Sequence, residues 1–163
     1  MTKNWLITEK IIAIFEIILG GVIIYFLYVS ISNLINILLN AEHNKWDNIS
    51  IAYLFNTYHF GFLVGLLNVF AGIFLLFNKR IGWIASLAAT SVLVSSILIT
   101  VISSTSINGF RVYVIVSLII CIVITAFSLL LFKSFREKYR PVKPALITAI
   151  LINALFIADN LFF

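Results

Sequence analysis

The sequence has 163 residues, of which 63% are hydrophobic, and only 17 carry a formal charge (11 Lys and Arg, 6 Asp and Glu). Charged residues make up 10% of the chain, against roughly 25% in soluble domains. At a mean hydropathy of +1.16, so few charges cannot cover the surface of a water-soluble fold of this size. Composition therefore excludes a soluble globular domain and predicts an all-α, polytopic integral membrane helical bundle.

Five long stretches without a charged residue mark the expected membrane-spanning helices, because about 20 apolar residues cross roughly 30 Å of hydrocarbon. We expect a single transmembrane domain with no soluble domain. Its helices are expected over 11–38, 60–77, 81–103, 111–133 and 144–163. The last of them spans the membrane only if Asp159 reaches the far interface, and otherwise it re-enters or lies flat. The prediction is therefore four to five spans.

Polar turns separate these helices. Asn78-Lys79-Arg80 forms a tight hairpin between the second and third helices, and the polar segment 103–109, ending in Asn-Gly, joins the third to the fourth. Both prolines, Pro141 and Pro144, lie between the fourth and fifth helices, where they end one helix and start the next.

The distribution of Lys and Arg predicts the orientation. A cytoplasmic N-terminus places nine of these residues on the inner side and only Lys45 and Arg111 on the outer side, as the positive-inside rule requires. Trp5 and Trp83 are then expected at the inner interface and Trp46 at the outer one. We therefore expect a multi-pass protein of the plasma (cytoplasmic) membrane, with the N-terminus and the 133–143 segment in the cytoplasm.

Small and polar residues recur on one face of several helices, where they favour close helix packing in lipid. In the second helix, Gly61, Gly65, Asn68 and Gly72 fall within about 60° of one another at 100° per residue. The first helix places Glu9, Ala13, Glu16 and Gly20 on one face. Further packing positions are expected at Gly82, Ser86, Ser117 and Cys121. A pore lining or an oligomer seam is the alternative function of these faces.

Three polar residues are expected inside the membrane: Glu16, Asn68 and Asn153. Glu16 costs on the order of 2 kcal/mol or more at this depth unless it is paired, hydrated or protonated. Ser86, Ser128 and Thr148 are expected at a similar depth and could donate hydrogen bonds to it. No basic residue is expected that deep, and a carboxyl group without a cationic partner suits proton or cation handling; the alternative is that a hydrated inner vestibule or Lys10 satisfies it. For the two asparagines we expect interhelical hydrogen bonds, with a substrate-binding pair as the alternative.

Two loop segments carry most of the remaining polar residues. The outer segment 40–59 contains Glu42, His43, Asp47 and His59, a set that could form an acid/base or metal site, although a solvated loop is favoured because no recognised ligand spacing occurs. Its second half, from Ile51 to Tyr58, is expected to be an interfacial segment. The inner segment holds five bases that determine topology and can contact anionic lipid or an acidic partner: Lys133, Arg136, Lys138, Arg140 and Lys143.

No catalytic, nucleotide-binding or metal-binding motif occurs in the sequence, so we expect no enzyme activity, no cofactor, no metal and no nucleic-acid partner. The favoured hypothesis is a small accessory, regulatory or immunity-type membrane component, acting within the lipid bilayer through self-association or a protein partner. A homo-oligomeric ion or proton channel, or a small carrier, using Glu16 is the first alternative. A membrane-embedded lipid-modifying enzyme at the outer face is the second.

Overall fold

The computed structural model describes residues 3–40, 51–103, 124, 127, 129–140 and 142–162 of the chain. Within these residues every regular element is an α-helix, and three of the helices, α1, α2 and α6, are long and apolar enough to cross a membrane. The bounds are α1 (Lys3–Asn40), α2 (Ile51–Leu76), α3 (Arg80–Ser103), α5 (Lys133–Lys138) and α6 (Val142–Phe162). The predicted all-α bundle is thus confirmed for the described part of the chain.

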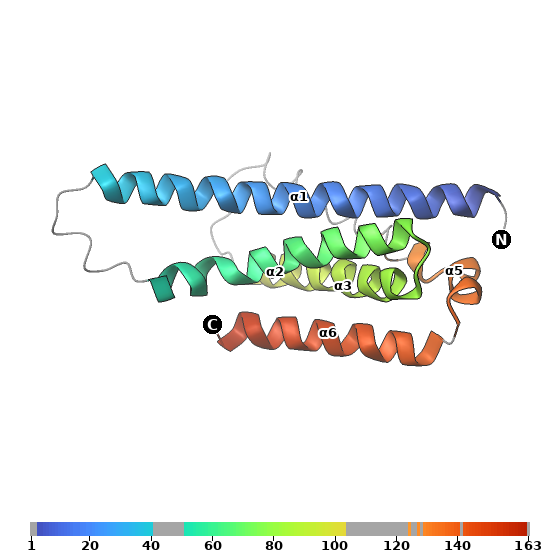
Figure 1. Ribbon diagram of the computed structural model, residues 1–163. Coiled ribbons are helices and arrows are strands. Elements are labelled where there is room, and N and C mark those ends of the chain that lie inside the picture. Colours follow the sequence, from blue (N-terminus) through green and yellow to red (C-terminus); the bar gives the residue numbers. More distant parts are fainter. Residues whose placement is uncertain are drawn as a thin grey trace.

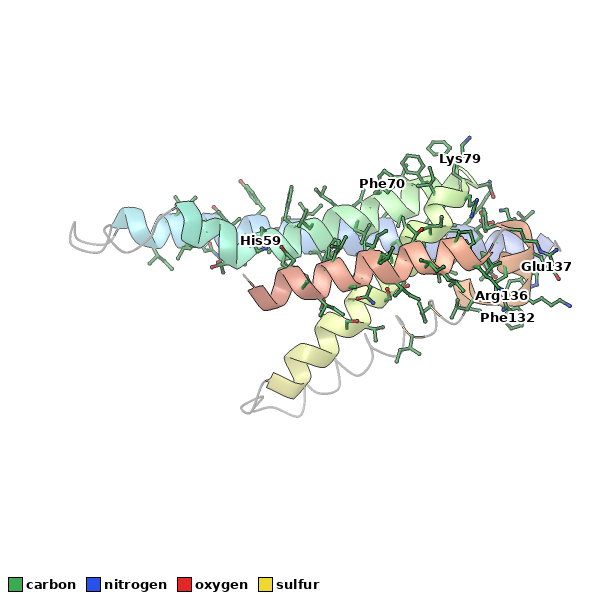
Figure 2. The ribbon with its side chains drawn as sticks, turned by 90° about the horizontal axis from the view of Figure 1, so that it is seen from below. His59, Phe70, Lys79, Phe132, Arg136 and Glu137 are labelled. Carbon is green, nitrogen blue, oxygen red and sulfur yellow. The ribbon has the colours of Figure 1, made fainter. Side chains whose placement is uncertain are left out.

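The helices α1, α2 and α6 run alongside one another in Figure 1, whereas α3 is inclined to them, as Figure 2 shows. α1 packs along α2, α2 turns back onto α3, and α6 packs along α3, so α1 and α6 flank the α2–α3 pair from opposite sides. The short helix α5 lies at the end of the bundle that also holds the start of α1 and the start of α6. We call this end, with the α2–α3 turn, the basic end, because the described Lys and Arg residues of these segments gather there.

The turn between α2 and α3 is a helix C-cap built by Asn78. Asn78 has a φ of 55°, and its N–H donates to the carbonyl of Leu75 at 2.9 Å. The N–H of Lys79 donates to the carbonyl of Phe74 at 3.0 Å. These two bonds form the Schellman pattern that satisfies the last carbonyls of a helix, and Asn tolerates the left-handed conformation that the pattern needs. The hairpin predicted at 78–80 is therefore confirmed.

α3 is the central helix of the bundle, since consecutive residues from Ala85 to Thr90 are buried on all sides. Most of these residues are small, so neighbouring helices can approach closely. Trp83 is also fully buried, and its ring N–H donates to the backbone oxygen of Leu130 at 3.0 Å. Trp83 thus faces the interior of the bundle, which satisfies its polar nitrogen, and its position at the inner membrane interface stays a prediction.

Backbone contact through glycine fixes how α1 lies on α2. A Cβ added at Gly72 would lie 2.5 Å from the carbonyl oxygen of Ala13, and one at Gly20 would lie 2.5 Å from that of Gly65. Residue 13 is thus level with residue 72, and residue 20 with residue 65, as in an antiparallel pair. At Gly61 the added atom would meet only the side chain of Leu27 at 3.2 Å. The predicted glycine face therefore packs on α1.

Two helices begin earlier than the charge pattern predicts. α1 begins at Lys3 rather than 11, and α2 begins at Ile51 rather than 60. Neither 3–10 nor 51–59 contains Gly or Pro, so nothing local stops α1 at Lys10 or α2 at His59, the residues used to delimit the expected helices. The interfacial segment expected from Ile51 to Tyr58 is instead the first part of α2.

The chain leaves the predicted fourth helix before residue 133. Phe132 has an extended ψ of 150°, and α5 begins as a separate helix at Lys133. Most of the predicted helix over 111–133, including Ser117, Cys121 and Ser128, lies outside the described residues. Trp5 stacks on Phe132 with ring centroids 4.7 Å apart, which joins the start of α1 to this break.

Candidate functional site

Glu16 lies inside the bundle and is 0% exposed. The hydroxyl of Ser86, on α3, donates a hydrogen bond to Glu16 Oε2 at 2.6 Å. The other carboxyl oxygen, Oε1, is buried and finds no hydrogen-bond partner among the described residues. Of the expected donors, Thr148 instead donates to the carbonyl of Pro144 in its own helix, and Lys10 is exposed on α1. The structure thus joins Glu16 to Ser86.

Asn68 is also 0% exposed. Its side-chain nitrogen donates to the carbonyl of Val64 in its own helix at 2.8 Å, while its Oδ1 has no partner within the described ranges. The amide N–H of Asn68 therefore turns back to α2, and no interhelical hydrogen bond of Asn68 is found among the described residues. Asn153 does reach another helix: its amide oxygen lies 3.4 Å from the hydroxyl of Ser95 on α3. The two asparagines do not pair with each other.

Packing places Glu16, Ser86 and Asn68 in one region of the interior. Asn68 shares the face of α2 whose glycines, Gly65 and Gly72, contact α1. Gly82 of α3 packs on the backbone of Phe74 and Leu75, so the antiparallel register puts Ser86 and Asn68 within about one helical turn along the bundle axis. The register of α1 on α2 puts Glu16 at the same height. We call Glu16, Asn68 and Ser86 the buried polar site.

A second polar group lies at the basic end. Glu9, 2% exposed, accepts a hydrogen bond from the Lys138 ammonium at 2.5 Å and another from the Tyr139 hydroxyl. Lys138 also donates to the side-chain oxygen of Asn78 at 2.6 Å. These four residues, the end cluster, connect α1, the α2–α3 turn and α5. Lys138 was expected to contact lipid or a partner; the structure pairs it with a buried carboxylate and leaves 22% of its side chain exposed.

The phenol of Tyr139 is held in its neutral, donating form. Burial raises the pKa of Tyr139 above its ordinary value, and the hydrogen bond and the negative charge of Glu9 raise it further. One face of the ring stacks on Trp83, with centroids 5.7 Å apart. Trp83 and Tyr139 both belong to the buried hydrophobic core, so the end cluster is continuous with that core.

The other four bases of the 133–143 segment point outward. Lys133, Arg136, Arg140 and Lys143 are all exposed, whereas Phe135 of the same short helix is completely buried. Figure 2 shows Arg136 and Glu137 projecting from the end of the bundle. Lys133 makes only an exposed contact with Glu137, at 3.8 Å. The arrangement therefore leaves most of the segment's positive charge on the surface.

At the opposite end, a side-chain hydrogen bond joins His59 of α2 to Asp159 of α6. His59 Nε2 lies 2.9 Å from Asp159 Oδ2, and the His59 side chain is only 7% exposed. A solvated loop was favoured for His59, and this is wrong, because the residue lies in α2 and faces α6. The residue also borders an apolar cleft of about 590 Å³ lined by α1 and α2. Glu42, His43 and Asp47 lie outside the described residues, so the outer-face enzyme stays a prediction.

Sequence reasoning missed the roles of Glu9 and Asp159. Asp159 was expected at the far interface, where water usually relieves the cost of a charge, and Glu9 was expected only on the packing face of the first helix. Their partners, Lys138 and His59, are 129 and 100 residues away, and no local spacing announces such pairs. In the described ranges no three His, Cys, Asp or Glu side chains come together as a metal site.

The fold and these sites define the class of protein: an all-helical chain with apolar helices of membrane-spanning length and a few buried polar contacts. The chain matches no protein-family model, no curated protein and no solved structure. Any assignment of function therefore depends on its own residues.

Proposed function

We propose that this protein is a small multi-pass component of the plasma membrane, without catalytic activity, that acts in an accessory, regulatory or immunity-type role through a protein partner or through self-association. The observation that supports this proposal most strongly is the basic end, where a helix anchored to the bundle presents exposed positive charge. Within the described residues, the buried acids Glu9 and Glu16 are each bonded to another helix and are not accessible to a partner.

The orientation is part of the proposal. Among the described residues, Lys and Arg gather at the basic end, and this asymmetry supports a cytoplasmic location for that end under the positive-inside rule. The outward faces of α1 and α6 are strongly apolar, with Ile14, Ile18, Ile150 and Leu155 exposed by half or more of their surface. Side chains of this kind are suited to contact lipid acyl chains.

α5 is suited to docking because its inward-facing side is anchored to the rest of the bundle. Phe135 and Tyr139 are buried beneath it, and the Lys138–Glu9 bond attaches it to α1. The backbone that carries its exposed bases is therefore held in place and need not become ordered on binding. Each base near an anionic surface contributes about 1 kcal/mol of attraction. An acidic partner surface or anionic headgroups would complement this positive charge.

Neutralising two of these bases is expected to weaken the partner complex several-fold. The variant is Arg136→Gln with Arg140→Gln, and the readout is the amount of partner, or of second copy, that is crosslinked in intact membranes. The matched control is Lys10→Gln with Lys79→Gln, which removes two exposed charges from the same end but away from α5. Equal crosslinking by both double variants would contradict the proposal.

The second candidate function is a homo-oligomeric channel or small carrier for ions or protons. It is favoured by the unpartnered oxygens of Glu16 and Asn68 within the interior. In proteoliposomes, Glu16→Gln is expected to lower ion or proton flux at least several-fold, because the carboxyl group is lost while the shape is kept. Flux that persists unchanged in this variant would remove Glu16 from the path. Asn153→Leu serves as the control, since Asn153 bonds to Ser95 instead.

A further inference from the structure

The buried polar site has two acceptors and too few donors. Glu16 Oε1 and Asn68 Oδ1 are both buried and both lack a hydrogen-bond partner among the described residues. Each is an oxygen, and each belongs to a side chain that is 0% exposed. A buried acceptor without a donor is costly, and a buried carboxylate without a counter-charge is more so. What the site lacks is therefore positive charge or a hydrogen that can be donated.

Among the described residues, no charged side chain that faces this site supplies what is missing. In the helices packed against Glu16, α2 has His59 as its only titratable side chain apart from tyrosines, at the far end, and α3 has only Arg80, in its first turn. On α1 itself, Glu9 is two turns away and is bonded to Lys138, while Lys10 is exposed. Ser86 supplies one donor, and Thr90 donates to carbonyls of its own helix.

We propose that Glu16 carries an exchangeable proton on Oε1 and donates it in a hydrogen bond to Asn68 Oδ1, while Ser86 donates to Oε2. The proton comes from water, and its binding turns one acceptor into a donor. A single added hydrogen therefore satisfies both unpartnered oxygens and removes the buried negative charge. The site is a proton-binding site shared by three helices. It is independent of the docking proposal, and it gives the channel or carrier alternative a specific chemical group.

A proton fits the site better than a metal ion. A metal cation needs several oxygen ligands arranged around it, whereas a proton needs only two oxygens. Within the described residues only Glu16 Oε1 and Asn68 Oδ1 are unpartnered side-chain oxygens in this interior, and the Ser86 hydroxyl already donates to the carboxyl. The site therefore has two free oxygens, which is the number that a shared proton needs.

Infrared spectroscopy of the protein in lipid nanodiscs tests the proposal directly. A protonated carboxyl group has a carbonyl stretch that ionised carboxylates lack and that shifts in deuterated water. At pH 7 we expect one such band in the wild-type protein, its loss in Glu16→Gln, and its retention in Glu137→Gln, which removes an exposed acid. Asn68→Leu should move the band to higher frequency, because the carboxyl loses its acceptor, and Asn153→Leu should leave it in place.

Several results would overturn the proposal. One is a wild-type spectrum at pH 7 without the band, and another is a band that survives Glu16→Gln. A band that disappears when sodium replaces a bulky organic cation at constant pH would assign the site to a metal ion instead. If Glu16→Gln does not fold, Ser86→Ala decides the question, because loss of its donated hydrogen bond must shift a Glu16 band and leaves any other carboxyl unaffected.

Discussion

Lys138→Met is expected to lower the free energy of unfolding by about 3–5 kcal/mol, because it leaves the buried carboxylate of Glu9 without its counter-charge. Glu9 is nearly inaccessible, and the remaining donor, Tyr139, is neutral. The same change also removes the donor to Asn78 at the α2–α3 turn. We therefore expect the start of α1 to separate from α5 before the rest of the bundle unfolds.

The control for this prediction is the same substitution one turn away. Lys133→Met removes an exposed ammonium whose partner, Glu137, is also exposed, and such pairs contribute at most about 1 kcal/mol. Denaturant titration in detergent micelles, followed by circular dichroism, measures both variants. Adding Glu9→Gln to Lys138→Met should restore much of the loss, since no buried charge then remains. Equal stability of Lys138→Met and Lys133→Met would show that the end cluster contributes little.

Gly82→Ala is expected to cost about 1–3 kcal/mol or more, because the added methyl group would overlap the backbone of Phe74 and Leu75. Neither neighbour can move aside as a flexible side chain could. The helices α2 and α3 would have to separate at the tight turn formed by Asn78. This separation would also shift Trp83 and Ser86. Thermal unfolding of the variant in micelles measures the loss.

Gly21→Ala is the matched control for that experiment. A methyl group at Gly21 meets nothing within 4 Å, and alanine favours a helix over glycine by about 1 kcal/mol. This variant should therefore be as stable as the wild type or slightly more stable. If both alanine variants lose the same stability, close α2–α3 contact is not the reason for glycine at position 82.

The fold was largely predictable because its determinants are local. Apolar stretches free of charge mark α1, α2, α3 and α6, and the polar turn at 78–80 ends one helix and begins the next. The face of Gly61, Gly65 and Gly72 follows from helical periodicity alone. The helix starts were less predictable, since charged residues do not end a helix: α1 begins at Lys3 and continues through Glu9 and Lys10.

The polar contacts were predictable only where the two partners lie at a similar expected depth in the membrane. Ser86 was expected near Glu16 because both lie at a similar depth, and the two are bonded. The Lys138–Glu9 pair could not be found in this way, because Lys138 belongs to a basic segment in which any of five bases was an equal candidate. Its selection depends on the rotation of α5, which Phe135 fixes by packing into the core.

The length of α1 has a consequence for how the protein sits in a bilayer. Its 38 residues extend for about 57 Å, whereas the 21 residues of α6 extend for about 31 Å, close to the thickness of the hydrocarbon. Exposed Tyr25 and Tyr28 follow Trp5 by roughly 30–35 Å, a spacing that matches the two aromatic belts of a membrane. The last part of α1, with the first turns of α2, would then stand above the headgroups as a two-helix stalk.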